Sequence, residues 1–355
     1  MITDKIKIKL IVLVILLILT INTEKIFAND LEESIKAFGD RVAGKSSWDS
    51  QKALVVFKAY ADKGDAKAQY YLANMYDRGL GIEKDLSKAA SLYQQSADQF
   101  YTPAEYSLGV MYERGMGVQV DLERAVSLYR KAAHKNFGLA QVNLGYMYEH
   151  GKGIAQNLGE ALKWYHKAAQ KGLPQAQFNL GIMYLMAKGV TKDVEEARKW
   201  FHLAGNQGHL YSQLNLAAMY EEGDGGVQDY KKALHWYLKA AKTGFPPAIS
   251  YVGYMYENGY GVNQDYKEAA RWYLNGAENK DGYGQSCLGI LYFEGRGVPQ
   301  DNVQAYKWLT LALSSLAPGG DLDRAKKYQK LVLEKITPEQ KAEAEKLIEE
   351  WKGKQ

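Results

Sequence analysis

Apolar and small residues recur along most of the chain with a period of 36 positions. Counted from Ala68 as offset 0, a small residue opens seven successive units, with Leu or Val at offset 4 and Tyr at offset 8. At ~100° per residue these positions share one side of a helix, so each unit is predicted to begin with an amphipathic helix. The offset-8 tyrosines are Tyr76, Tyr112, Tyr148, Tyr184, Tyr220, Tyr256 and Tyr292.

The second half of each unit carries the signals of a turn and a second helix. Gly79 at offset 11 and Gly81 at offset 13 suit a left-handed helix end followed by a tight reversal. Asp85 at offset 17 has an Asp or Asn equivalent in every unit, which can accept from the free amides of the next helix. Aromatic pairs such as Trp164-Tyr165 follow at offsets 24 and 25. In three units a Glu three residues after the cap predicts a capping box, at Glu160, Glu196 and Glu268.

This regularity defines the organisation of the chain. One helical hairpin cannot bury its apolar stripe alone, so neighbouring units must stack into a continuous core. We therefore expect an all-α fold, a right-handed α/α solenoid (superhelix) of helix-turn-helix repeats over residues 49–316, as a half repeat and seven full repeats. Residues 29–48 are predicted to form an N-terminal cap and residues 317–355 C-terminal capping helices, the last beginning with a cap at Thr337 and Pro338 in its first turn.

The N-terminus has the pattern of a secretory signal peptide. Lys5, Lys7 and Lys9 precede an apolar run from Leu10 to Ile21, which is shorter than the ~18 residues that span a bilayer. Ile26-Phe27-Ala28 then predicts cleavage after Ala28, so that residues 1–28 are the signal peptide. We expect an exported protein that meets a membrane only through this segment if it is left uncleaved.

Composition narrows the function classes further. A net charge of +4 in 355 residues gives no strong basic patch and argues against nucleic acid as a partner. A single Cys excludes an internal disulfide framework and a cysteine-based zinc cluster. Of the 34 Gly, 22 occupy repeated turn and helix-packing positions, and 12 of the 27 Tyr occupy repeated core positions.

The repeated pattern reads A-x-x-x-L-G-x-x-Y-x-x-G-x-G-V followed by D-x-x-K-A-x-x-W-Y-x-x-A-A-x-x-G, and it is nearly complete between Ala248 and Gly276. It resembles the Sel1-like repeat, a relative of the tetratricopeptide repeat with a longer loop. The resemblance covers about residues 46–316.

The resemblance implies an α-solenoid adaptor of the kind found in endoplasmic-reticulum degradation complexes and in exported or periplasmic bacterial proteins. Several bacterial relatives are tied to host-cell interaction. A cysteine-rich subgroup, in which each hairpin is bridged by a disulfide, is linked to β-lactam binding. This chain lacks those cysteine pairs, because Cys287 is its one cysteine.

No catalytic motif stands out along the sequence. The six His lack metal-ligand spacing, and H-E-x-x-H, C-x-x-C and G-x-S-x-G do not occur. Lys242-Thr243-Gly244 matches one penicillin-recognising motif, but Gly244 is the ordinary repeat glycine and no S-x-x-K serine accompanies it. The sequence predicts no catalytic, cofactor-binding or metal-binding residues.

Binding residues are sought on the other side of the first helices, at offsets 2, 6 and 9, which line the concave groove in related solenoids. Offset 9 forms an acidic row of Asp77, Glu113, Glu149, Glu221 and Glu257. Offset 2 adds Tyr70 and Tyr106, and offset 6 adds Tyr146 and Tyr254. In the seventh unit, offset 9 is Phe293. Such aromatic side chains are typical anchors of protein interfaces.

The fourth unit interrupts the acidic row with an apolar patch of Phe178, Ile182, Leu185 and Met186. An apolar patch with a polar rim is typical of a partner site. Two interpretations stay open, since these residues either line a groove or pack internally. The acidic row is likewise either a binding rim or a plain solvated face.

We conclude from the sequence that the chain is a non-enzymatic, exported scaffold or adaptor that needs no cofactor and binds a protein or peptide in its groove. The predicted location is the periplasm of a Gram-negative bacterium or the space beyond it. One alternative is a secreted host-interaction factor of a pathogen. Another is a β-lactam-binding or β-lactam-hydrolysing enzyme, which the missing cysteine pairs disfavour.

Overall fold

The computed structural model describes residues 30–42 and 49–353, and the regular secondary structure of these ranges is helical. The predicted signal peptide and its cleavage site lie outside the described residues. The chain divides into two compact units, a first unit up to Ala168 and a second unit from Ala169 onward. None of the described helices combines the length and the hydropathy that crossing a bilayer requires.

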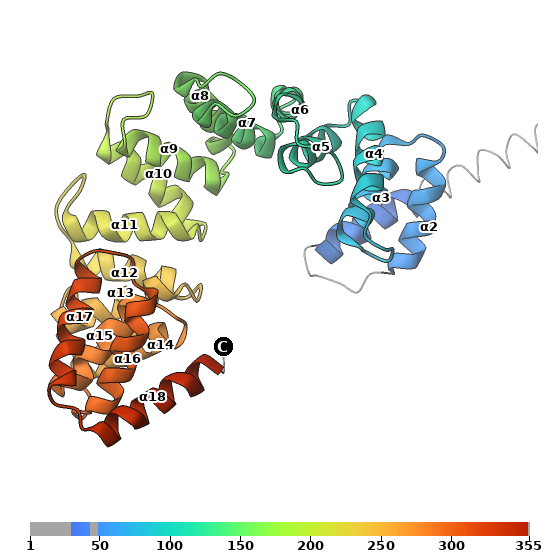
Figure 1. The fold of residues 1–355 in the computed structure, drawn as a ribbon. Helices are drawn as coiled ribbons and strands as arrows, with labels where there is room; N and C mark the ends of the chain where they lie inside the picture. The colour runs from blue at the N-terminus through green and yellow to red at the C-terminus, as the bar shows by residue number, and fades with distance from the viewer. Residues whose placement is uncertain (1–29, 43–48, 354–355) are drawn as a thin grey trace, which may run out of the picture. The chain divides into compact units, whose positions relative to one another are not determined.

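In the first unit, residues 30–42 are helical and precede seven further helices (Figure 1). Each first helix of a repeat packs on the second helix that follows it, as α3 does on α4 and α5 on α6. The helices are α2 (Ser50–Ala61), α3 (Ala66–Arg78), α4 (Leu86–Asp98), α5 (Thr102–Arg114), α6 (Leu122–His134), α7 (Gly138–His150) and α8 (Leu158–Ala169).

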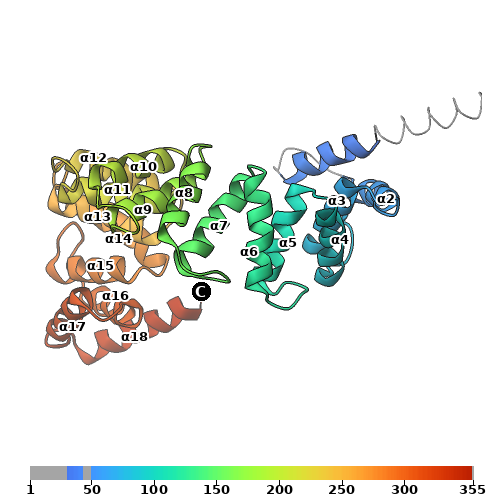
Figure 2. The same cartoon turned by 90° about the horizontal axis from the view of Figure 1, so that it is seen from above.

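In the second unit the same alternation continues and ends with two helices that follow the last repeat (Figure 2). The helices are α9 (Pro174–Leu185), α10 (Val194–Asn206), α11 (Leu210–Glu222), α12 (Tyr230–Ala241), α13 (Pro246–Asn258), α14 (Tyr266–Glu278), α15 (Gly282–Glu294), α16 (Asn302–Ser315), α17 (Gly320–Leu333) and α18 (Pro338–Gly353). The all-α repeat fold predicted from the 36-residue period is confirmed.

The turn between the two helices of a repeat forms as predicted. Gly79 ends α3 in the left-handed conformation, with φ 66°. Asp85 then begins α4, and its carboxylate accepts from the Lys88 amide at 2.9 Å. Asp121, Asp193 and their equivalents repeat this arrangement at the start of the later second helices.

The predicted capping boxes of the repeats are wrong. The backbone N–H of Asn157, which a capping box would direct to Glu160, donates instead to the carbonyl of Tyr148 at 2.9 Å. Glu160 pairs with Lys163 at 2.7 Å, and Glu196 and Glu268 likewise pair with the basic residue three positions on. The longer loop brings the tyrosine carbonyl within reach of the cap amide, which leaves the glutamate free for a surface ion pair.

The capping box before the last helix does form. The Thr337 amide donates to Gln340 Oε1 at 3.1 Å, and the Gln340 amide donates to Thr337 Oγ1 at 3.3 Å. No preceding tyrosine carbonyl competes at this helix start, so the short sequence signal is sufficient here.

In each repeat, the second helix contributes a small side chain and a large side chain to the core. The alanine at offset 21 is fully buried in all seven repeats, from Ala89 to Ala305. The aromatic ring at offset 25 lies against the first helix, where a Cβ on Gly109 would stand 2.7 Å from Tyr129 Cε1. The glycine at offset 5 is therefore required where the tyrosine ring crosses the helix so closely.

The ends of the repeat array are covered by helices. Leu31 and Phe38, from the helical residues before α2, are buried against Phe57 and Tyr71. At the other end, Ala325 and Val332 of α17 and Ile348 of α18 join the core of the last repeat. Both segments behave as caps, which stacked repeats need because their terminal faces are apolar.

Candidate protein-binding site

A cavity of about 370 Å³ opens on the first helices of the first unit. Of the predicted groove residues, Tyr70, Asp77 and Tyr106 line it together, from α3 and α5. The cavity is also lined by Asn74, Arg78, Tyr93, Ser107, Val110, Met111, Arg114, Met116, Phe137 and Leu139. Its size falls within the roughly 300–1,000 Å³ of typical ligand pockets.

Aromatic packing fixes the walls of this cavity. The Tyr70 ring packs edge-on against Tyr101 with 5.3 Å between centroids and contacts Tyr93 at 5.7 Å. Tyr106 contacts Phe137 at 5.3 Å and Tyr129 at 5.9 Å. Burial raises the pKa of the Tyr106 phenol, so its hydroxyl stays protonated and available as a donor at neutral pH. The walls are therefore rigid, apolar surfaces with a few polar atoms.

The acidic row has a structural role that neither sequence interpretation foresaw. The Tyr129 hydroxyl donates to Glu113 Oε2 at 2.5 Å, from the second helix to the first helix of the same repeat. The same bond joins Tyr165 to Glu149 at 2.9 Å, Tyr237 to Glu221 at 2.9 Å and Tyr273 to Glu257 at 2.7 Å. These glutamates tie the helices of a hairpin together, so they are not simply solvated.

The sequence contains a signal for this pairing, because the residues at offsets 9 and 25 change together from repeat to repeat. Where offset 9 is Leu185 in the fourth repeat, offset 25 is Phe201, which has no hydroxyl. Where it is Phe293 in the seventh repeat, offset 25 is Leu309. The carboxylate and the hydroxyl are present together or absent together, as expected of partners that would each be costly to bury unpaired.

Tyr146, in the third repeat, is held by two basic neighbours instead of lining the cavity. Lys152 Nζ donates to the Tyr146 hydroxyl at 2.9 Å and lies 4.8 Å from the ring centroid. The His150 ring packs against the Tyr146 ring at 4.2 Å. This tyrosine is half-buried and forms a separate polar and aromatic surface on α7.

In the second unit, the apolar patch of the fourth repeat is mostly packed rather than open. Phe178 contacts Phe201 at 5.9 Å and the His209 ring at 4.8 Å, and it is half-buried with Ile182 and Leu185 against the neighbouring core. Met186 alone is well exposed, at 59%. The interpretation that these residues pack internally therefore describes most of the patch.

The helix that carries this patch ends earlier than its equivalents. α9 ends at Leu185, and the next turn contains Ala187 at φ 56°, a left-handed conformation that costs about 1 kcal/mol or more without glycine. Ala187 therefore holds the left-handed conformation that glycine provides at the same position of other repeats, such as Gly79 and Gly115.

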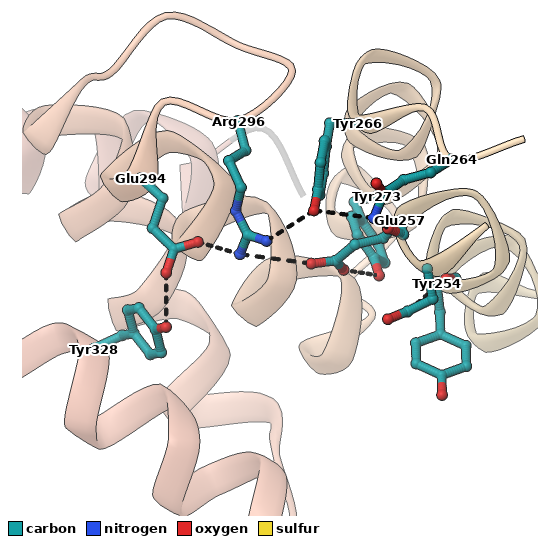
Figure 3. A network of polar contacts seen from close by, with 9 residues as sticks. Tyr254, Glu257, Gln264, Tyr266, Tyr273, Glu294, Arg296 and Tyr328 are labelled. Atoms are coloured by element: carbon teal, nitrogen blue, oxygen red, sulfur yellow. Dashed lines mark hydrogen bonds and ion pairs between the residues drawn. The ribbon is translucent and has the colours of Figure 1, made fainter.

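Phe293 and Glu257 are not surface groove residues, and Figure 3 shows the polar network around Glu257. Phe293 is 8% exposed because Tyr328 of α17 packs edge-on against it at 6.0 Å, so the C-terminal cap covers a position that the sequence places in the groove. Glu257 is buried, accepts from Tyr273 and lies 3.8 Å from Arg296, which also pairs with Glu294. Phe293 is thus covered by a cap helix that no repeat offset predicts, and Glu257 is held by a tyrosine of its own repeat and an arginine of the next.

Tyr254 stays outside this polar network, and in Figure 3 its ring points away from Arg296. It packs edge-on against Tyr260 at 5.6 Å. Burial is the main cause that raises the pKa of its phenol to about 12. Tyr254 is thus a half-buried aromatic side chain of the second unit.

Titratable groups of the described chain show no catalytic arrangement. Within residues 30–42 and 49–353, no three His, Cys, Asp or Glu side chains gather as metal ligands would. Cys287 is buried, and burial raises the pKa of its thiol to about 12, so it is a poor nucleophile at neutral pH. Burial lowers the pKa of both His202 and His209, which keeps these rings neutral.

Two solved structures of bacterial proteins are similar to this chain. A Sel1 repeat protein from Oxalobacter formigenes is 30% identical, covers 68% of this chain and 96% of its own, and superposes with a TM-score of 0.60. A protective antigen present in uropathogenic Escherichia coli strains is 24% identical, covers 92% of this chain and 76% of its own, with a TM-score of 0.55. No curated protein matches the chain significantly.

The sequence profile described as the Sel1 repeat matches seven consecutive segments. Repeats of this and the related tetratricopeptide type are generally non-catalytic and mediate protein–protein interaction. The matched segments are residues 66–99, 102–137, 138–173, 174–209, 210–245, 246–281 and 283–315. With most of its length matched in this way, the chain belongs to the Sel1 repeat family.

Proposed function

We propose that this protein is a non-enzymatic, exported scaffold that binds a protein partner through the first helices of its first unit. The observation that carries the proposal is the cavity between α3 and α5, where three residues chosen from the sequence pattern converge. Rigid aromatic side chains around a cavity are what protein interfaces use as anchor sites.

The cavity offers a substitution that leaves the fold intact. Leu139 lines the cavity from α7 and is 46% exposed, so Leu139→Glu places a charge at the opening without entering the core. Val120 is 56% exposed, does not line the cavity, and supplies the matched control Val120→Glu. Both variants should keep the wild-type melting temperature and helical circular dichroism.

The test is quantitative affinity capture from envelope extracts of the native host, with mass spectrometry of the bound proteins. The wild type and Val120→Glu should retain the same partner, and Leu139→Glu should lose at least about nine tenths of it, because burying an unpaired charge at an interface costs several kcal/mol. Equal retention by Leu139→Glu would refute the assignment of this face.

Export to the periplasm or beyond rests on the basic and apolar pattern of residues 1–28. Expression of the full chain in a Gram-negative host, followed by fractionation and N-terminal sequencing, should yield a periplasmic or secreted protein that begins at Asn29. Recovery of the uncleaved chain from the cytoplasm would refute export. Appearance in the medium would favour the secreted host-interaction alternative.

The absence of catalysis is tested separately. The purified chain should not turn over nitrocefin, the β-lactam reporter relevant to the cysteine-rich relatives. Measurable turnover that follows the protein through purification would overturn the non-enzymatic proposal.

A further inference from the structure

Two arginines at the cavity of the first unit have no charged partner among the residues that the structure describes. Arg78 is the last residue of α3 and Arg114 is the last residue of α5, one repeat further on. Both side chains are exposed and line the cavity. Neither guanidinium forms an ion pair or hydrogen bond with another residue of the described ranges, whereas Arg124 and Arg296 do.

Helix-end electrostatics does not account for these two residues. A cation at a helix C-terminus is favourable by roughly 0.3–1 kcal/mol, which explains why the position tolerates arginine. However, the same offset carries Glu222 at the end of α11 and Glu294 at the end of α15. The fold therefore accepts either sign there, and the basic choice beside the cavity needs another reason.

The charge and the apolar wall of the cavity favour a ligand that carries an anionic group next to an apolar group. Asp77 is the one carboxylate that lines the cavity, against two guanidiniums, so the lining carries a net positive charge. Val110, Met111 and Phe137 supply apolar wall. A guanidinium binds a carboxylate through two parallel hydrogen bonds, which gives both strength and orientation.

We infer that this cavity binds an acidic peptide segment of the partner, in which a carboxylate side chain lies close to a large apolar side chain. The apolar side chain enters between Tyr70 and Tyr106, and the carboxylate pairs with Arg78 and Arg114. The inference rests on the proposed function and specifies the partner chemistry for the same face.

The test uses fluorescein-labelled synthetic peptides and the mature chain in a fluorescence anisotropy titration. Each peptide places one Glu and one Phe, separated by zero to four residues, in a Gly-Ser background. Control sets replace Glu by Gln or Phe by Ala. The protein variant is Arg78→Gln with Arg114→Gln, and its charge-matched control is Lys84→Gln with Lys131→Gln, two exposed lysines that do not line the cavity.

The best Glu-Phe peptide should bind the wild type and the lysine control equally. Its affinity should fall at least about tenfold for the arginine variant, and by the same factor when its Glu is replaced by Gln, because both changes remove the charge-assisted hydrogen bonds between the carboxylate and the two guanidiniums. Added salt should weaken wild-type binding and have little effect on the arginine variant.

The outcomes separate this inference from the proposed function. If Gln-Phe peptides bind as tightly as Glu-Phe peptides, the face binds peptides without charge selection, and the inference alone is overturned. If no peptide of any set binds while Leu139→Glu still abolishes partner capture, the inference is again overturned and the proposed function stands. If capture is also unchanged by Leu139→Glu, both fail.

Discussion

At the residue scale, hydrogen bonds between a tyrosine of the second helix and a glutamate of the first helix connect the two helices of a repeat. They join side chains 16 positions apart in sequence, as between Tyr237 and Glu221. The repeated offsets 9 and 25 make both positions visible in the sequence, but the row of acidic residues alone is compatible with either a binding rim or a solvated face. Only the joint change of both positions in the fourth and seventh repeats indicates the pairing.

A double-mutant cycle should detect this bond. Tyr237→Phe should lower the free energy of unfolding by about 1–2 kcal/mol, because it leaves a half-buried carboxylate without its donor. Glu221→Leu with Tyr237→Phe reproduces the Leu and Phe pair of the fourth repeat, and its loss should be smaller than the sum of the single losses by about 1 kcal/mol. Urea denaturation measures all three variants. Strict additivity would contradict the pairing.

The same glutamate predicts a pH effect. Burial raises the pKa of Glu221 above its ordinary value of 4.5, more than the Tyr237 hydrogen bond lowers it. The folded state therefore binds the proton more tightly than the unfolded state, so the contribution of Glu221 to stability is fully present below pH 4.5 and is lost as the pH rises through the raised pKa. Relative to Glu221→Gln, the wild type should lose stability across this interval in urea titrations. Parallel pH profiles would contradict the shift.

At the element scale, the sequence predicts the helices, their order and their turns because each depends on local chemistry that repeats seven times. Helix ends at Gly79 and helix starts at Asp85 follow directly from backbone requirements. Spacing alone does not reveal that the capping boxes expected at Glu160, Glu196 and Glu268 fail to form, since a tyrosine carbonyl from the preceding helix reaches the cap amide first.

The glycine at offset 13 of a repeat should be more sensitive to substitution than a glycine elsewhere that also has a positive φ. A Cβ on Gly153 would lie 2.4 Å from the backbone of Leu122 in the preceding repeat, whereas one on Gly64 would meet nothing within 4 Å. Gly64→Ala should cost about 1–2 kcal/mol through its positive φ alone. Gly153→Ala should cost at least about 1 kcal/mol more, because packed backbones must separate. Equal losses of thermal stability would contradict this account.

In the second repeat, an ion pair between a buried glutamate and an exposed lysine replaces an amide pair found in other repeats. Glu105 is 1% exposed and pairs with Lys135 at 2.7 Å, where the first repeat has Gln69 and Gln99 at 2.8 Å. Lys135→Gln should cost about 3 kcal/mol, since it leaves a buried carboxylate without its cation. Adding Glu105→Gln should restore most of the loss in chemical denaturation. A double variant no more stable than Lys135→Gln would contradict the interpretation.

At the scale of the whole molecule, the candidate residues belong to two units, and their surroundings differ within each unit. Tyr70, Asp77 and Tyr106 meet at a cavity in the first unit. Phe178 and its neighbours pack largely into the second unit, and Phe293 is covered by α17. Offsets along a repeat identify a helix face, but whether that face is open depends on neighbouring side chains and cap helices outside the repeat pattern.

The arginines show the complementary limit of the repeat pattern. Arg78 and Arg114 occupy an offset whose residue type varies from repeat to repeat, so the consensus gives no reason to select them. Their importance follows from the absence of a partner among the described residues and from their place beside the aromatic walls. Function in such a protein is expected where the repeats differ, since the shared residues are occupied with folding.

One measurement tests the central claim most directly. The photo-crosslinking amino acid benzoylphenylalanine replaces Leu139 at the cavity or Val120 away from it, in the full chain expressed in its native host. We predict a partner adduct from position 139 that disappears when Arg78→Gln and Arg114→Gln are added, and no adduct from position 120. An adduct from position 120 with none from position 139 would contradict the claim that this face is the binding site.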